Sequence, residues 1–314
     1  MFPSNPGKRP IAWVTGAAGF LGGHVAHRLQ AEGWSVVGMG GLTEGAGLAT
    51  LAAGYPGPIT ASMLEQVQRN WPTPQLVVHA AGTGSVGAAA ADPLRAFERT
   101  VSTTAVLLDH LRRHAPDARV LYPSSAAVYG VNPGDPLRED GPLHPASTYG
   151  WHKLMAEHLL RDAVEIHDQP CCAIRFFSIY GPGLRKQVLW DWSQRILGGE
   201  SPLRLAGSGR EIRDFLYVDD AVALILHLAR LDRKALPGVI NGGSGEGATM
   251  ANLAAQLSTV LGRSVDVRFE GQVRAGDPPY YLASTQRLRA LGIACPVPLG
   301  EGLARYAEWV RTVV

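Results

Sequence analysis

Short apolar runs alternate with longer amphipathic stretches through the first half of the chain. The runs have the length of buried strands, whereas the stretches between them repeat apolar residues with the period of a helix. Five strands are predicted, at residues 11–15, 35–39, 76–80, 119–122 and 171–176. Helices between them are predicted at residues 19–32, 93–114 and 148–167. This alternation is typical of right-handed βαβ units, which build one doubly wound parallel sheet, so the predicted fold class is α/β.

After Phe177 the rhythm changes, because segments punctuated by glycine and proline replace the strict alternation. This change favours a smaller, loop-rich C-terminal lobe. The helix that opens at Asp219 and Asp220 is expected to return to the first domain, which makes the boundary discontinuous. The predicted larger domain spans residues 9–176 and about 214–241, and the predicted smaller lobe spans about 177–213 and 242–314.

The composition excludes several functional classes. Lys and Arg number 29 against 27 Asp and Glu, and only 18% of the residues are charged, so no basic surface for nucleic acid or an anionic membrane is expected. A hydrophobic content of 46% excludes a disordered chain, and no apolar run has the length of a membrane span. The three cysteines form neither a disulfide framework nor a CxxC pair, so a cytoplasmic location is expected.

Three glycines at a strand-to-helix junction indicate a phosphate-binding turn. The segment VTGAAGFLGG places Gly16, Gly19 and Gly22 directly after the first predicted strand. Glycine allows a tight turn, lets the backbone approach a pyrophosphate and lets the helix pack closely on the sheet, while the helix N-terminus supplies amide donors. This context predicts a Rossmann-like domain that binds a dinucleotide.

The residue that usually chooses between NAD and NADP is missing from its expected place. A carboxylate commonly ends the second strand and holds the adenosine ribose. Here the run SVVGMGGL puts Gly40 at that position, and no Arg or Lys stands nearby to favour a 2′-phosphate. Both dinucleotides therefore stay open at this position.

A tyrosine, a lysine and a serine form the candidate catalytic set. Tyr149 and Lys153 lie four residues apart at the start of a predicted helix and therefore share one face. A neighbouring ammonium and a cationic nicotinamide ring would lower the pKa of the phenol from about 10, so that it exchanges a proton with a sugar hydroxyl. Ser125 follows a strand at the carboxyl edge of the sheet, in a position to hydrogen-bond the reacting oxygen.

Five segments, TGAAGFLG, HAAG at residues 79–82, SSAAVYG, YGWHK and RDFLYVDDAV, occur together in this order. In them the chain resembles the extended short-chain dehydrogenase/reductases, specifically the nucleotide-sugar epimerase/dehydratase family. The resemblance implies that Tyr149, Lys153 and Ser125 are catalytic and that the smaller lobe binds the substrate. The implied cofactor contacts are Gly16, Gly19, Phe20, Leu21, Gly22, Ala80, Ala81, Gly82, Ser124, Tyr149 and Lys153. The implied contacts to a nucleoside diphosphate sugar are Ser85, Ser125, Ser178, Arg213 and Arg274, with the two arginines on the diphosphate.

Departures from the family patterns narrow the reaction. Dehydratases of the family carry an Asp-Glu pair after the catalytic serine and decarboxylases carry a Glu, whereas this chain has Ala126 and Ala127, whose methyl groups perform no acid/base chemistry. The resemblance therefore implies redox chemistry at C4, and an NAD-dependent nucleotide-sugar 4-epimerase is favoured. An NAD(P)H-dependent 4-keto-sugar reductase stays open, as does a non-catalytic protein that senses a dinucleotide. Thr100 and Ser178 stand where the family has asparagines that position cofactor or substrate.

Two further expectations concern partners and metals. In this family the helices that correspond to Phe97–His114 and Tyr149–His167 commonly form a four-helix contact, so the resemblance implies a homodimer. His110 and His114 lie four residues apart on a predicted helix, but no Asp, Glu or Cys joins them as a further ligand. No metal site is therefore expected.

Overall fold

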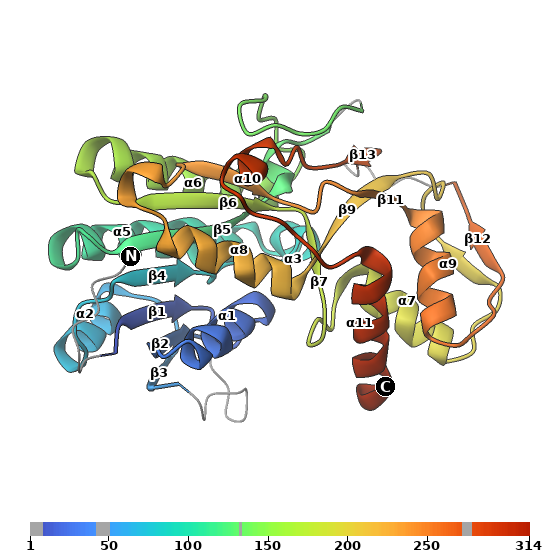
Figure 1. The fold of residues 1–314 in the computed structure, drawn as a ribbon, viewed down its shortest axis with the longest axis horizontal. Helices are drawn as coiled ribbons and strands as arrows, with labels where there is room; N and C mark the ends of the chain where they lie inside the picture. The colour runs from blue at the N-terminus through green and yellow to red at the C-terminus, as the bar shows by residue number, and fades with distance from the viewer. Residues whose placement is uncertain (1–8, 42–50, 132–133, 272–277) are drawn as a thin grey trace. The chain divides into compact units, whose positions relative to one another are not determined.

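A computed structural model describes residues 9–41, 51–131, 134–271 and 278–314 (Figure 1). The strands are β1 Ile11–Thr15, β2 Ser35–Gly40, β3 Ala53–Pro56, β4 Leu76–His79, β5 Arg119–Ser125, β6 Cys171–Phe176, β7 Ser178–Tyr180, β8 Leu203–Leu205, β9 Ile212–Tyr217, β10 Val239–Gly242, β11 Gly247–Thr249, β12 Val267–Phe269 and β13 Tyr280–Tyr281. The helices are α1 Phe20–Ala31, α2 Ala61–Asn70, α3 Val86–Ala91, α4 Pro93–Phe97, α5 Thr103–His114, α6 Thr148–His167, α7 Gln187–Leu197, α8 Val218–Arg230, α9 Met250–Val260, α10 Gln286–Ala290 and α11 Leu299–Val313.

A seven-stranded sheet has the order β10-β6-β5-β4-β1-β2-β3. Strand β1 pairs in parallel with both β2 and β4, and β4 pairs in parallel with β5. The chain therefore first adds β2 and β3 on one side of β1 and then adds β4, β5, β6 and β10 on the other side. This change of direction makes the boundary between β1 and β4 a topological switch point. Ligands of open α/β sheets bind outside the carboxyl ends of the strands at such a point. The predicted α/β class with a Rossmann-like doubly wound sheet is confirmed.

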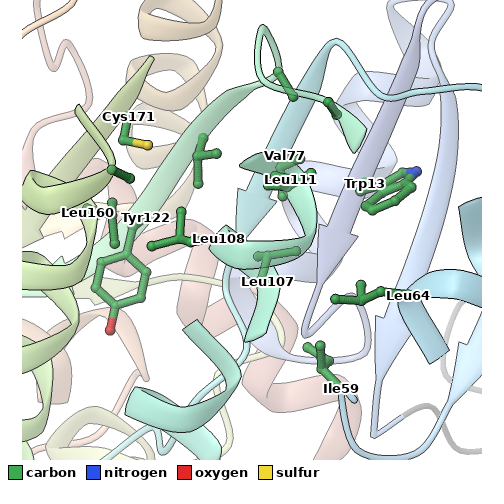
Figure 2. Close-up of a cluster of buried hydrophobic side chains, with 14 of the residues drawn as sticks. Trp13, Ile59, Leu64, Val77, Leu107, Leu108, Leu111, Tyr122, Leu160 and Cys171 are labelled. Carbon is green, nitrogen blue, oxygen red and sulfur yellow. The ribbon is translucent and has the colours of Figure 1, made fainter. Parts of the chain in front are cut away.

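One face of this sheet packs against α2, α5 and α6. Because side chains alternate along a strand, every second residue reaches this face, including Trp13 of β1 and Tyr122 of β5. Figure 2 shows Leu107 and Leu111 of α5 reaching into the same cluster, and each of them is fully buried. The cluster also includes Leu160 of α6, so packing fixes β5 and α6, which carry the predicted catalytic residues, against each other.

The segment that the sequence predicts as one helix over residues 93–114 is helical throughout, but its α-helical geometry is interrupted. It forms α4, a π-helical turn over Glu98–Ser102 and then α5. Hydroxyl groups explain the interruption, because Thr103 donates to the Arg99 carbonyl and Thr104 donates to the Thr100 carbonyl, each at 2.6 Å. Such side-chain bonds take up carbonyls of the helix and bend it. π-helical turns of this kind are frequent at functional sites.

The chain divides into two compact units. The first comprises Met1–Val128, Pro145–Arg175 and Val222–Ile240, and the second comprises Tyr129–His144, Phe176–Ala221 and Asn241–Val314. The second unit contains a small sheet in which β9 pairs with β7, β11 and β13, together with the pair β8 and β12. Its helix α9 packs against both α7 and α11.

Candidate active site

The predicted phosphate-binding turn joins β1 to α1 by a close backbone fold. Gly16 has a φ of +67°, and a Cβ at this position would lie 2.8 Å from the Ala80 carbonyl carbon. A Cβ at Gly22 would lie 2.2 Å from the Gly16 carbonyl oxygen. Gly19 precedes α1 and offers no side-chain cap, so the first-turn amides, which lack partners within a helix, face outward as anion donors. The structure thus brings Gly16, Gly19 and Gly22 together, with Phe20 and Leu21 in the first turn.

The loop Ala80–Gly82 is held beside this turn by a directed chain of hydrogen bonds through His79. The Ala81 N–H donates to Thr15 Oγ1 at 3.0 Å, and Thr15 Oγ1 lies 2.7 Å from His79 Nδ1. His79 Nε2 lies 3.0 Å from Thr104 Oγ1, whose own proton goes to the Thr100 carbonyl. Each hydroxyl has one proton to give, so Thr15 donates to Nδ1 and His79 carries its proton on Nε2.

Burial keeps this imidazole neutral. Desolvation, and to a lesser degree the charge of Lys153, lowers the pKa of His79 to about 3. A neutral ring accepts at Nδ1 and donates at Nε2, as the chain of hydrogen bonds requires. His79 therefore couples the end of β1 to the π-helical turn, a role that its place in HAAG did not reveal.

Thr100 occupies the position where the resemblance expects asparagine. Its side chain is 2% exposed, and its hydroxyl accepts from the Thr83 N–H at 3.1 Å. A Cβ at Gly82 would touch the same hydroxyl at 3.4 Å. Thr100 thus performs a local positioning task, because it holds the loop that follows HAAG against the π-helical turn.

The candidate catalytic set meets where β5 ends and α6 begins. Ser147 caps α6 by accepting from the Gly150 N–H at 3.1 Å, which places Tyr149 in the first turn of the helix. Lys153 follows one turn later, and its Nζ donates to the Pro123 carbonyl at 2.8 Å. The same ammonium lies 5.9 Å from the centre of the Tyr149 ring. Ser125 ends β5, and its hydroxyl, which accepts from the Ala127 N–H at 3.2 Å, is near enough to Tyr149 to lower the pKa of the phenol. The structure thus brings the three residues together.

The pKa of Tyr149 is raised, which is opposite to the acidification that the sequence suggests for a phenol beside an ammonium. Burial is the larger cause, since it penalises the phenolate, and the hydrogen bond from Ser125 lowers the pKa only in part. Lys153 directs one proton to Pro123 and stands over the Tyr122 ring, 4.5 Å from its centre. Acidification of the phenol would therefore need the positive charge of an oxidised nicotinamide in addition to Lys153.

Replacing Ser125 by alanine is expected to move the rise of the rate with pH to higher pH. The serine hydroxyl lowers the pKa of Tyr149, so its removal raises that pKa, and the phenolate forms only at higher pH. Initial rates measured between pH 6 and pH 10 provide the test. The matched control is Ser258→Ala, because Ser258 donates to Ala254 within α9, and its profile should coincide with that of the wild type. An unshifted Ser125→Ala profile would contradict the expectation.

Two other predicted contacts have structural partners of their own. Ser124 is 4% exposed, and its hydroxyl donates to Glu157 Oε1 at 2.5 Å. A cofactor contact from Ser124 therefore falls to its backbone or to the lone pairs of its oxygen. Ser85 caps α3, where its hydroxyl accepts from the Ala88 N–H at 3.2 Å.

The remaining predicted substrate contacts belong to the second unit. Ser178 begins β7, which pairs in parallel with β9, so that Ser178 faces Phe215 in the register. Arg213 lies on β9, where its guanidinium donates to the Ile212 carbonyl and stands 5.9 Å from the centre of the Tyr281 ring. Arg274 lies outside the described residues.

Asp214, which follows Arg213, supports the second unit from inside. It is fully buried and accepts from the N–H groups of Ser244, Gly245 and Ala283 at 2.7, 3.0 and 3.2 Å. This carboxylate therefore anchors the strand that carries Arg213.

Among the residues that the structure describes, no group of three or more His, Cys, Asp or Glu side chains is arranged to hold a metal ion. Within the same ranges, no helix has the length and apolar character needed to cross a membrane. His110 and His114 stack with ring centres 4.6 Å apart.

Comparison with known proteins gives the family. The profile of the NAD dependent epimerase/dehydratase family matches residues 12–243. The chain belongs to this family. A UDP-glucose 4-epimerase of Azospirillum brasilense is 32% identical over 97% of this chain and 93% of that protein. The predicted family is therefore confirmed.

Solved structures of similar proteins agree with this assignment. The UDP-glucose 4-epimerase of Thermotoga maritima, solved with UDP-glucose, superposes with a TM-score of 0.87 at 28% identity, covering 96% of this chain and 99% of that one. The Thermus thermophilus UDP-glucose 4-epimerase, in a complex with NAD, gives a TM-score of 0.87 at 25% identity, with coverage of 97% and 100%.

The residues present fit the dinucleotide of the NAD-dependent epimerase/dehydratase family. Gly16 and Gly22 leave a cradle that a Cβ would fill, and the first turn of α1 offers amides to a pyrophosphate. The missing carboxylate at the end of β2 also has a structural reason. Gly40 has a φ of +117°, and a Cβ there would lie 3.3 Å from the Gly16 nitrogen, which donates to the Met39 carbonyl at 2.7 Å. Position 40 therefore favours glycine over any residue that would hold a ribose.

Proposed function

We propose that this chain is an NAD-dependent UDP-sugar 4-epimerase. The observation that carries the proposal is the arrangement of Ser125, Tyr149 and Lys153 at the carboxyl edge of the sheet, where the serine lowers the pKa of the phenol and the ammonium lies 5.9 Å from the centre of the tyrosine ring. The similarity to UDP-glucose 4-epimerases over nearly the whole chain supports the choice of a UDP-sugar.

The roles of the three residues follow from their contacts. Tyr149 takes the proton of the sugar C4 hydroxyl as the carbon is oxidised and returns it when the carbon is reduced. Ser125 hydrogen-bonds the same oxygen and holds it near the phenol. Lys153 stabilises the phenolate by its charge. NAD, if bound in the glycine cradle, would supply a reversible hydride acceptor for C4, and inversion would require the hydride to return to the opposite face of that carbon.

The residues after Ser125 support epimerisation over elimination of water or carbon dioxide. Ala126 and Ala127 follow it in a turn of 3₁₀-helix, and their methyl groups cannot move protons at the carbons next to C4. Proton transfer is thus confined to the C4 oxygen, which is all that an epimerase of this type needs.

We also place the diphosphate of the substrate on Arg213, with Arg274 as the second guanidinium and Ser85 and Ser178 as polar neighbours of the sugar. Two guanidinium groups would neutralise the two charges of a diphosphate with paired hydrogen bonds. The backbone of Arg213 is held in place for this task, since the side chain of the adjacent Asp214 accepts hydrogen bonds from three backbone N–H groups.

Incubation of the purified protein with UDP-glucose tests the proposal. Chromatography should detect UDP-galactose, and denaturation of the enzyme should release NAD that stays bound through turnover. A 4-keto-sugar reductase would instead consume one equivalent of NADH or NADPH for each product and exchange the cofactor. A dinucleotide-sensing protein would release NAD without converting any of UDP-glucose, UDP-N-acetylglucosamine or UDP-glucuronate. Either of these results would refute the epimerase.

We further propose a homodimer built on α5 and α6. Large apolar side chains stand exposed on α6 and at the end of α4, which leads into α5: Trp151 is 50% exposed, Met155 40% and Phe97 37%. Trp151 and Met155 lie one turn apart on the same face of α6. Exposed apolar patches of this kind commonly mark a protein interface.

Replacing Trp151 by glutamate is expected to convert the dimer to a monomer, because a charge would be buried without a partner at the contact. Light scattering gives the mass of each form. Val131→Glu is the matched control, since Val131 is an exposed apolar residue, 60% accessible, outside α5 and α6. A monomeric mass for the wild type would contradict the dimer.

We assign the protein to the cytoplasm. All three cysteines, Cys171, Cys172 and Cys295, are free thiols. Free thiols persist in a reducing compartment, and burial raises the pKa of Cys171 to about 12, which keeps that thiol unreactive. Fractionation of the native source with a specific antibody tests the assignment, and recovery in a secreted fraction would refute it.

A further inference from the structure

A buried ion pair lies directly behind the candidate catalytic set. Glu157 of α6 and Arg175 of β6 are 8% and 4% exposed. Arg175 donates to the carboxylate from two nitrogens, with Nη2 at 2.8 Å from Oε2 and Nε at 3.2 Å from both oxygens. Neither residue belongs to the machinery already described, although Glu157 stands one helical turn beyond Lys153 on the same face.

The pair reaches the catalytic strand through one further hydrogen bond. Glu157 Oε1 accepts from the hydroxyl of Ser124 at 2.5 Å, and Ser124 immediately precedes Ser125. One turn earlier, Lys153 ties the same strand end through the Pro123 carbonyl at 2.8 Å. Pro123 and Ser124, which are consecutive in β5, are therefore hydrogen-bonded to side chains on two consecutive turns of α6.

The energetics of a buried ion pair point away from stability as its purpose. Removal of two charges from water costs about as much as their attraction returns, and well-packed apolar residues often replace such a pair without loss of stability. The directional contact to Ser124 is what an apolar pair cannot reproduce. Arg175 orients the carboxylate, and the carboxylate orients the strand end.

We propose that Glu157 and Arg175 are positioning residues for the 4-epimerase reaction, which act through Ser124 to hold Ser125 at the phenol of Tyr149. This inference rests on the proposed function for its kinetic readout. Tyr149, Lys153 and Glu157 lie at intervals of four on α6, so a shift of the helix against β5 displaces the base, the ammonium and the anchor together. Displacement of a reacting group by about 1 Å can cost a factor of about 100 in rate.

The decisive variant removes both charges at once. The double variant Glu157→Leu, Arg175→Met keeps the volume but lacks the acceptor for Ser124. Its thermal midpoint is expected to lie within about 4 °C of that of the wild type. Its kcat for UDP-glucose is expected to fall about 100-fold, with little change in KM. Ser124→Ala, which leaves the ion pair intact, should lower kcat in the same way with little effect on the midpoint.

A purely structural role gives a different result. In that case the double variant keeps both the wild-type kcat and the wild-type thermal midpoint, and Ser124→Ala has no effect on kcat. This outcome overturns the inference. Crystal structures of the wild type and of the double variant give a readout that is independent of activity, since the inference expects the Ser125 hydroxyl to move away from the Tyr149 phenol in the variant. An unchanged distance between Ser125 Oγ and the Tyr149 phenol oxygen would overturn the inference even if the wild type converts no UDP-sugar, a result that by itself refutes only the proposed function.

Discussion

Replacement of Tyr149 by phenylalanine is expected to lower kcat by a factor of about 10² to 10⁴, the usual contribution of a positioned general acid or base. The variant keeps the ring at the start of α6 and loses only the hydroxyl whose pKa Ser125 lowers. Binding of NAD should persist, because the glycine cradle between β1 and α1 is untouched. Steady-state kinetics with UDP-glucose, together with the NAD content of the purified variant, provide the measurement.

Tyr55→Phe is the matched control for this experiment. It also removes one phenol hydroxyl, which here accepts a hydrogen bond from Asn70 at 3.2 Å, and kcat should stay at the wild-type value. If Tyr149→Phe retained more than about a tenth of the wild-type kcat, the proton would have to pass through another group.

The second large effect is expected from Gly22→Val. A Cβ at this position would lie 2.2 Å from the Gly16 carbonyl oxygen, and both atoms are backbone or directly attached to it, so α1 must shift away from the turn. Overpacking of this kind costs about 1–3 kcal/mol, and at the upper end an equal loss of cofactor affinity would raise the Kd of NAD about 100-fold. Isothermal titration with NAD measures the change.

Gly238→Ala serves as the control, because a Cβ at Gly238 would meet no heavy atom within 4 Å. Its Kd should equal that of the wild type. An unchanged Kd for Gly22→Val would show that α1 does not set the shape of the cofactor cradle.

The main strands and α6 were predictable because the pattern of apolar residues within each segment is enough to indicate its secondary structure. An apolar run such as IAWVT is buried whatever its neighbours in the sheet are, and α6 occupies the predicted residues from Thr148 to His167. Strand β3, with the sequence AGYP, was not predicted because glycine and proline weaken a strand signal, and this short strand lies at the edge of the sheet.

The site was predictable in part for the same reason. The glycine spacing and the Tyr149–Lys153 spacing act within one turn of chain, so the sequence shows both. The contacts of His79 join residues up to 64 positions apart, and no local pattern reveals them. Arg175 did leave a signal, since it is the one charge in the apolar run CCAIRFF, and a buried arginine requires a partner.

The raised pKa of Tyr149 marks another limit of the sequence. The spacing of Tyr149 and Lys153 fixes their proximity but not the depth of the phenol. Burial acts more strongly on this group than its hydrogen bond with Ser125 does, and burial depends on how β5, α6 and the adjoining turn pack in three dimensions.

The neutral His79 makes folding sensitive to acid although the folded ring itself does not titrate there. The pKa of His79 is about 3 in the native protein against 6.5 for a free imidazole. Between pH 3 and pH 6.5, therefore, His79 is protonated in the unfolded chain and neutral in the native protein. Proton uptake then favours unfolding, and this residue's contribution to stability declines as the pH drops below about 6.5. In molecules that stay folded in mild acid, His79 nevertheless still accepts from Thr15 at Nδ1 and donates to Thr104 from Nε2. Protonation of Nδ1, which would turn this acceptor into a donor, occurs only near pH 3.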